Sequence, residues 1–138
     1  MALRIYVDAA FGEGLAAIAA VQAGASEPLF SLLIPAKDNN EAELIGYYLA
    51  ALRAPEGAVL CTDSGRVHAL LRGRTLPSQA ELPYLEGIHL AMEQKGLTHA
   101  FMGGKRRRRR RAHRFLHAQA DRLAYETLQN ALNALHEP

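Results

Sequence analysis

Four carboxylates stand at positions where the chain could do chemistry. Asp8 and Asp63 each lie at or near the end of an apolar, strand-like segment, and open α/β sheets bind their ligands at the carboxyl ends of strands. Glu43 falls in the first turn of an expected helix, and Asp121 lies beside the apolar stripe of another. These four side chains are candidates for a ligand-binding or catalytic site if the fold brings them together.

Each carboxylate also has an ordinary structural explanation. Asp63 precedes Ser64 and is well placed to form a turn or to cap a helix. Glu43 follows Asn40 by three residues, which is the spacing of a capping box, and it would complement the helix dipole. Asp121 fits a solvated position on the flank of its helix equally well. No single carboxylate therefore indicates a site, and the case depends on the set.

Turn signals and apolar spacing predict the elements that must position these residues. Strands are expected at 4–8, 15–21, 29–34, 58–62 and 97–102. Helices are expected after an N-cap at Asn39 or Asn40, directly after 63–65, over 85–93, and through a long C-terminal segment from about 116 to 135. The segment 15–21 is rich in alanine and could propagate a helix, but it is short and bounded by glycine-containing turns, which favours a strand. The order β-β-β-α-β-α-α-β-α predicts a mixed sheet covered by helices.

Length and composition set the class of protein. A chain of 138 residues predicts one domain spanning 1–138, large enough to fold without disulfides or a structural metal. Hydrophobic residues at 49% and charged residues at 22% exclude extended disorder. The single cysteine, Cys61, excludes a disulfide framework and favours a reducing compartment. No apolar stretch reaches the length of a membrane span, and the N-terminus lacks a signal-peptide pattern. We expect a cytoplasmic protein with no membrane contact and no obligate protein partner.

One segment carries a dense positive charge and is expected to form an arginine-rich loop at about 103–114. It holds eight of the 16 Lys and Arg residues and no acidic one, so the net charge of +2 leaves −6 on the rest of the chain. Arginine-rich runs are typical of nucleic-acid contacts, although a solvated loop explains the run alone equally well. The candidate nucleic-acid-binding residues in it are Lys105, Arg106, Arg107, Arg108, Arg109, Arg110, Arg111 and Arg114.

Taken in order, the four carboxylate segments resemble type 1 ribonuclease H. The matching segments are Ile5-Tyr6-Val7-Asp8, Asn39-Asn40-Glu41-Ala42-Glu43-Leu44, Cys61-Thr62-Asp63-Ser64 and His117-Ala118-Gln119-Ala120-Asp121-Arg122-Leu123-Ala124. The resemblance spans nearly the whole chain and includes the order of the elements. It implies an α/β, ribonuclease H-like fold. In that fold a five-stranded mixed sheet, with three antiparallel strands first and β-α-β crossovers after them, is flanked by helices.

The resemblance also implies a catalytic site. Asp8, Glu43, Asp63 and Asp121 would converge at one end of the sheet, act as catalytic residues and bind two Mg²⁺ ions, with Mn²⁺ as a possible substitute. Two such ions can generate a hydroxide nucleophile and stabilise the leaving oxygen of a phosphodiester. The family cleaves the RNA strand of RNA–DNA hybrids and leaves 5′-phosphate and 3′-hydroxyl ends.

The chain departs from the family pattern at several positions. Ala9-Ala10 replace Gly-Ser, Gly65 replaces a glutamine, and His117 stands where the family has asparagine. Arg111 aligns with the family's mobile histidine, so the nearest candidate for a proton shuttle is His113, for which a solvated loop histidine is the alternative. The chain also lacks tryptophan, so the arginine run is the candidate replacement for the basic, tryptophan-bearing protrusion of some bacterial relatives.

The sequence thus predicts a metal-dependent endoribonuclease acting on RNA–DNA hybrids. Asn39 and Asn40 match an asparagine pair that helps the family read nucleotides, and amides can contact the 2′-hydroxyl that distinguishes RNA. Two alternatives stay open. One is a catalytically weak or inactive ribonuclease H-like module that binds nucleic acid, and the other is a nuclease of this fold acting on another structure, such as branched DNA. Retention of all four carboxylates favours the enzyme, because a binding module has no need for a like-charged cluster.

Overall fold

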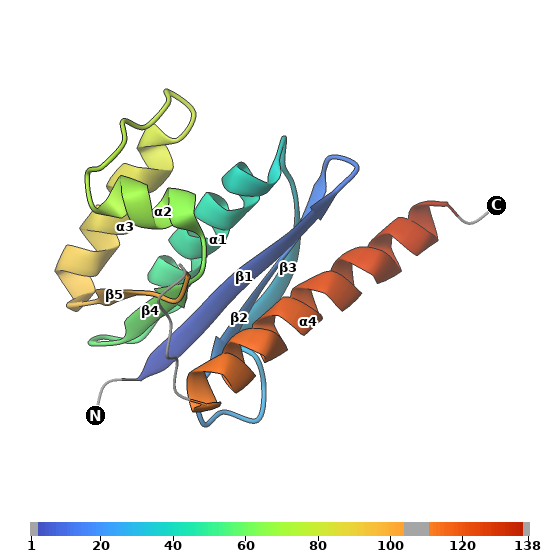
Figure 1. Cartoon of the computed structure of the whole chain (residues 1–138), viewed down its shortest axis with the longest axis horizontal. Helices are drawn as coiled ribbons and strands as arrows, with labels where there is room; N and C mark the ends of the chain where they lie inside the picture. The colour runs from blue at the N-terminus through green and yellow to red at the C-terminus, as the bar shows by residue number, and fades with distance from the viewer. Residues whose placement is uncertain (1–2, 104–110, 137–138) are drawn as a thin grey trace.

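A five-stranded mixed sheet organises the fold (Figure 1). The computed structural model describes residues 3–103 and 111–136, with the side chains of the second range described from Phe115 onward. The strands are β1 (Arg4–Gly12), β2 (Leu15–Gln22), β3 (Phe30–Pro35), β4 (Val59–Thr62) and β5 (Thr98–Phe101), in the order β3-β2-β1-β4-β5. The pairs β1–β2 and β2–β3 are antiparallel, whereas β1–β4 and β4–β5 are parallel. The predicted sheet and the predicted order of elements are confirmed.

Helices cover both faces of the sheet. Within the described residues they are α1 (Asn39–Arg53), α2 (Gly65–Leu71), α3 (Leu82–Lys95) and α4 (Arg111–Leu135). The helix α1 packs on one face against β1 and β2, with α2 and α3 beside it, and α4 crosses the opposite face (Figure 1). None of the described helices is both long and apolar enough to cross a membrane.

The alanine-rich segment is a strand because it lies between two helical layers. All four alanines of β2 are completely buried, as is Ile18, and the small alanine side chains let α1 and α4 approach the sheet closely. A Cβ atom added at Gly46 of α1 would stand 2.7 Å from Ile18 Cγ2. Tertiary packing therefore overrides the helix propensity of alanine in this segment.

Alternation of side chains along β1 decides which face of the sheet each residue occupies. Ile5 and Val7 belong to the core under α1, and Tyr6 belongs to a second core with Cys61 and Ala120 of α4. Successive side chains of a strand point to opposite faces of the sheet. Asp8, two residues after Tyr6, therefore projects on the side covered by α4.

The cap of α1 differs from the prediction. Asp38, rather than Asn39 or Asn40, is the N-cap, and its Oδ1 accepts a hydrogen bond from the Glu41 N–H at 2.8 Å. Glu41 reaches back to accept from the Lys37 N–H at 3.1 Å. The negative charge of Asp38 also complements the positive end of the helix dipole. The predicted N-cap at Asn39 or Asn40 is therefore wrong, and the capping-box explanation of Glu43 does not apply.

The last helix also begins earlier than predicted. Its first residue is Arg111, inside the segment 103–114 for which the sequence predicts a loop. Apolar spacing could not locate this start because the first turn has no apolar stripe, whereas arginine and alanine are both good helix formers. Residues 104–110, which hold most of the arginine run, lie outside the described residues.

Candidate functional site

Two aspartates meet at the carboxyl ends of neighbouring parallel strands. Tyr6 of β1 is paired in register with Cys61 of β4. Asp8 and Asp63 each follow their paired residue by two positions, so the parallel register carries both carboxylates to the same edge. The Asp8 side chain is 6% exposed and that of Asp63 is 37% exposed. The carboxylate of Asp8 is thus buried, and that of Asp63 is accessible to solvent.

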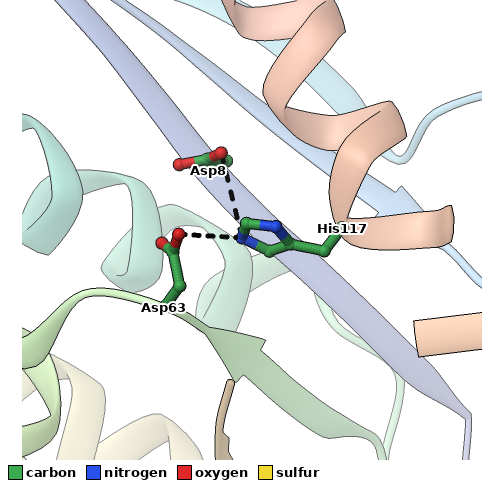
Figure 2. Close-up of side chains that lie close together, drawn as sticks. All are labelled: Asp8, Asp63 and His117. Atoms are coloured by element: carbon green, nitrogen blue, oxygen red, sulfur yellow. Dashed lines mark ion pairs between the residues drawn. The ribbon is translucent and has the colours of Figure 1, made fainter. Parts of the chain in front are cut away.

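A histidine from α4 completes this pair (Figure 2). His117 Nε2 lies 3.2 Å from Asp63 Oδ2 and 3.9 Å from Asp8 Oδ2. The ligand atoms of the three residues all lie within 4.8 Å of one another, which makes them a candidate metal-holding group. The three side chains come from β1, the turn after β4, and α4, and they point toward a common centre (Figure 2).

Glu43 approaches the same centre from α1. It is 7% exposed, and its pKa is raised to about 9 by burial first and then by the negative charges of Asp8 and Asp63. A side-chain hydrogen bond with Asp8 raises the pKa of Glu43 further. Burial and repulsion both disfavour the ionised form of a carboxyl group. Glu43 therefore belongs to the cluster and is not the capping residue that its position allowed.

The electrostatics of Asp8 reflect all of its neighbours. Burial raises the pKa of Asp8 to about 7, and the charge of Asp63 raises it next. The charge of His117 and a 2.9 Å hydrogen bond from the Ala9 N–H to Oδ1 act in the opposite direction. Asp121, exposed on α4 one turn beyond His117, lies close enough to raise the pKa of Asp8 as well. The structure thus brings together the four carboxylates singled out in the sequence.

Local structure excludes the capping explanation for Asp63. The N-cap of α2 is Ser64, whose hydroxyl accepts a hydrogen bond from the Val67 N–H at 3.1 Å. The turn at Asp63 and Ser64 packs tightly against the segment that follows β5. A Cβ atom added at Gly103 would lie 2.6 Å from Phe101 Cζ and 2.9 Å from the Asp63 carbonyl oxygen. A glycine at this position lets the chain pass close to Asp63.

The other predicted residues either are exposed at the start of α1 or have side chains outside the described part of the chain. Asn39 and Asn40 are exposed in the first turn of α1. Asn40 lines a cleft of about 230 Å³ together with Arg66, which is bound to Glu81 at 2.6 Å. The side chains of Arg111, His113 and Arg114 lie outside the described residues, as do all of Lys105, Arg106, Arg107, Arg108, Arg109 and Arg110.

His117 is the site residue that sequence reasoning missed. The sequence marks it only as a departure from the family's asparagine and assigns it no role. Its spacing was nevertheless informative, because residues four apart on a helix share a face, and Asp121 is four residues further along. A histidine and an aspartate at this spacing form a pair of potential ligands on one face of α4.

The donor set fits divalent cations. Buried like charges raise the pKa of Asp8 and of Glu43 far above their ordinary values, and a bound cation would remove that penalty by favouring the ionised forms. Carboxylate oxygens suit Mg²⁺ and Mn²⁺, and an imidazole nitrogen suits transition metals. With metal bound, such a cluster can activate water and stabilise a leaving oxygen.

Comparison with known proteins agrees with this architecture. No family model and no curated protein matches the chain. Among solved structures, an RNase H1 isolated from compost by a metagenomic approach aligns with a TM-score of 0.69 and 17% sequence identity, over 95% of this chain and 98% of that one. The N-terminal RNase H domain of a Mycobacterium tuberculosis protein, solved as a fusion with maltose-binding protein, aligns with a TM-score of 0.66 and 22% identity, over 91% of this chain and 98% of that one. The chain therefore has the ribonuclease H-like fold that the sequence resemblance implied.

Proposed function

We propose that this chain is a metal-dependent endoribonuclease that hydrolyses the RNA strand of RNA–DNA hybrids and leaves 5′-phosphate and 3′-hydroxyl ends. The observation that carries the proposal is the convergence of Asp8, Glu43, Asp63 and Asp121, from β1, α1, the turn after β4 and α4, at one edge of a ribonuclease H-like sheet. Two solved proteins of this fold are named as ribonucleases H. Their function and the carboxylate cluster together support the assignment.

In this proposal the chain's own residues bind and orient the reacting groups. Asp8, at the centre of the cluster, would contact both of two Mg²⁺ or Mn²⁺ ions, with Glu43 and Asp63 on either side and Asp121 on the side of the attacking water. When bound, two such ions lower the pKa of water and stabilise the oxygen that leaves. Asp8 and Glu43 are buried, so their carboxylates are held in fixed positions, whereas the 37% exposure of the Asp63 side chain leaves room for a phosphate beside it.

Three further assignments come from the sequence. Asn39 and Asn40, exposed at the start of α1, would contact the nucleotide sugar, where the 2′-hydroxyl distinguishes RNA from DNA. The arginine run, from Lys105 to Arg111 with Arg114, would contact phosphates without reading the base sequence. His113 would move a proton or assist product departure.

Cleavage of a labelled hybrid tests the proposal. The RNA strand of an RNA–DNA hybrid is incubated with the protein and Mg²⁺ or Mn²⁺, with single-stranded RNA, duplex DNA and a four-way DNA junction in parallel. Asp63→Asn is the test variant, since Asp63 is more exposed than the buried Asp8 and Glu43 and its change disturbs the fold less. Glu126→Gln, an exposed carboxylate elsewhere on α4, is the matched control.

The expected result is metal-dependent cleavage of the hybrid alone by the wild type and by Glu126→Gln. Asp63→Asn should still bind the hybrid but lose cleavage, and the products should carry 5′-phosphate ends. Cleavage of the junction but not the hybrid would show that the chain is a nuclease whose substrate is branched DNA. A folded wild type that binds the hybrid with either metal and never cuts it would refute the enzyme and favour a binding module.

A further inference from the structure

We propose that His117 is a metal ligand and that its nitrogen makes the site select Mn²⁺ and Co²⁺ over Mg²⁺. This inference rests on the proposed function, because it concerns the same carboxylate cluster. It adds a donor that the four-carboxylate description lacks and assigns an ion preference to it. Three features support it: the position of Nε2, the way α4 holds the imidazole, and the chemistry of nitrogen ligands.

The distances around His117 match those between ligands of one ion. Two ligand atoms at about 2.1 Å from an octahedral ion lie about 3 Å apart when adjacent and about 4.2 Å apart when opposite. Nε2 lies 3.2 Å from Asp63 Oδ2 and 3.9 Å from Asp8 Oδ2, and all three ligand atoms lie within 4.8 Å of one another. The two Nε2 distances fall within this range, whereas the widest separation in the group, up to 4.8 Å, exceeds it. A single cation therefore fits among the three ligand atoms once the side chains draw closer together.

Helix packing keeps the imidazole at the cluster. The His117 side chain is only 12% exposed. Its neighbour on α4, Leu116, packs against the core that contains Tyr6 and Cys61, and Ala120 is completely buried in the same core. This turn of α4 is therefore anchored on both sides of His117. Because the helix is fixed to the sheet, the ring nitrogen is presented to Asp8 and Asp63 before any ion arrives.

The chemical type of the donor atom determines which ions bind more tightly. Mg²⁺ is a hard cation that prefers oxygen and keeps its waters. Imidazole nitrogen is a borderline donor, and affinity for nitrogen-containing sites rises from Mn²⁺ to Co²⁺ along the Irving–Williams order. A site with only carboxylates would discriminate weakly between Mg²⁺ and Mn²⁺. One nitrogen donor shifts the preference toward the transition ions.

The competing explanation is that His117 is a counter-ion. A protonated imidazole between two carboxylates would offset their charge in place of a metal, and an incoming ion would then have to displace it. The two explanations predict opposite effects of removing the ring. If His117 is a ligand, Mn²⁺ binding weakens without it, whereas if His117 is a counter-ion, binding of every divalent ion strengthens.

Metal binding to the untagged 138-residue chain distinguishes these cases without any substrate. Isothermal titration with Mn²⁺, Co²⁺ and Mg²⁺ is compared for the wild type, His117→Gln and His117→Asn. Glutamine places an amide near the position of Nε2, and asparagine is the shorter amide. His89→Gln, which removes an exposed histidine of α3, is the control for adventitious binding. Pulsed electron paramagnetic resonance of bound Mn²⁺ reports directly whether an imidazole nitrogen is coupled to the ion.

The ligand assignment predicts a nitrogen coupling in the wild type and in His89→Gln but not in either His117 variant. It also predicts that His117→Gln weakens Mn²⁺ and Co²⁺ binding about tenfold and Mg²⁺ binding much less. Mn²⁺ bound without nitrogen coupling, or bound more tightly by His117→Gln, would overturn the inference while leaving hybrid cleavage and the loss in Asp63→Asn intact. If the wild type binds none of these ions and leaves the hybrid uncut, the proposed function fails together with the inference.

Discussion

Replacing Asp8 by asparagine should stabilise the metal-free protein. Asp8 is 5% exposed, and burial together with the charge of Asp63 raises its pKa from 3.8 to about 7. For an acid whose pKa is raised by folding, the protonated form adds stability that is fully present below the unfolded pKa and is lost as the pH rises through the folded pKa. At pH 8 the ionised Asp8 therefore opposes folding.

The size of the effect follows from the same values. At about 1.4 kcal/mol per pKa unit, the difference between 3.8 and about 7 corresponds to about 4 kcal/mol at pH 8. Asparagine removes the charge but weakens the hydrogen bond from the Ala9 N–H, so we expect a net gain of about 2 kcal/mol. For a chain of this length that gain raises Tm by about 8 °C.

Urea and thermal unfolding with a chelator present measure this gain. Asp8→Asn should exceed the wild type at pH 8, and the difference should shrink toward pH 5 because Asp8 is then protonated in the wild type. Glu126→Gln, an exposed carboxylate on α4, should stay within about 0.5 kcal/mol of the wild type. Adding Mn²⁺ at 100 times its Kd should stabilise the wild type by about 2.7 kcal/mol and the Asp8→Asn variant by less. If Asp8→Asn is the less stable protein at pH 8 in chelator, the electrostatic reasoning is wrong.

Three further predictions test other parts of the molecule. Gly103→Ala should lower the free energy of unfolding by about 1–3 kcal/mol and slow hybrid cleavage, because its Cβ would meet a backbone carbonyl at 2.9 Å. Gly65→Ala, in the first turn of α2 with no atom within 4 Å of its Cβ, should raise the free energy of unfolding by up to about 1 kcal/mol. A loss of stability in both variants in urea unfolding would contradict this reasoning. His99 has a pKa lowered to about 4 by burial, so the unfolded chain takes up its proton first and stability should fall by about 1–3 kcal/mol between pH 6.5 and pH 4. His99→Gln should remove that loss in urea titrations, whereas His89→Gln should not. Replacing residues 106–111 by serine should weaken hybrid binding. It should also reduce the slope of log binding constant against log salt concentration by about 0.9 for each phosphate that the run neutralises. Fluorescence anisotropy measures both quantities, and an unchanged slope would assign the run to a solvated loop.

The fold could be predicted because local signals agreed with one another. Glycine and proline turns bound the strands, and the apolar spacing of residues after 40 and after 116 has the period of a helix. The alanine-rich segment 15–21 was the ambiguous case. Its length and flanking turns indicated a strand, and burial between α1 and α4 explains why it is one. Agreement across these levels is what makes element order readable from sequence.

Capping details could not be predicted, because several residues competed for the same role. Asp38, Asn39 and Asn40 are all good N-cap residues, and only the structure shows that Asp38 accepts the hydrogen bond. The same ambiguity applied to Asp63 and Ser64, of which Ser64 caps α2. Resolving both caps has a functional consequence, because it removes the capping explanations of Glu43 and Asp63.

The convergence of the carboxylates was implied by resemblance and not by spacing. Asp8 and Asp63 are 55 positions apart in the sequence, and only the parallel register of β1 with β4 makes them neighbours. His117 was harder still, since its role depends on how α4 lies across the sheet. Sequence patterns indicate whether a segment is a helix or a strand more readily than they indicate how two such elements pack together. The position of His117 depends on how α4 packs across the sheet.

The cluster argues against a protein that only binds nucleic acid. Its four carboxylates come from β1, α1, the turn after β4, and α4, so no local cap or turn accounts for it. Asp8 and Glu43 are buried side by side with pKa values raised to about 7 and about 9, which destabilises the fold at neutral pH unless a cation binds. A binding module would gain stability from a mutation that removed the charge of Asp8 or Glu43, without losing its function. Strained or repulsive arrangements persist at functional sites because the function requires them. The increase in the free energy of unfolding that we expect for metal-free Asp8→Asn therefore measures the stability that the fold loses by keeping this carboxylate at the site.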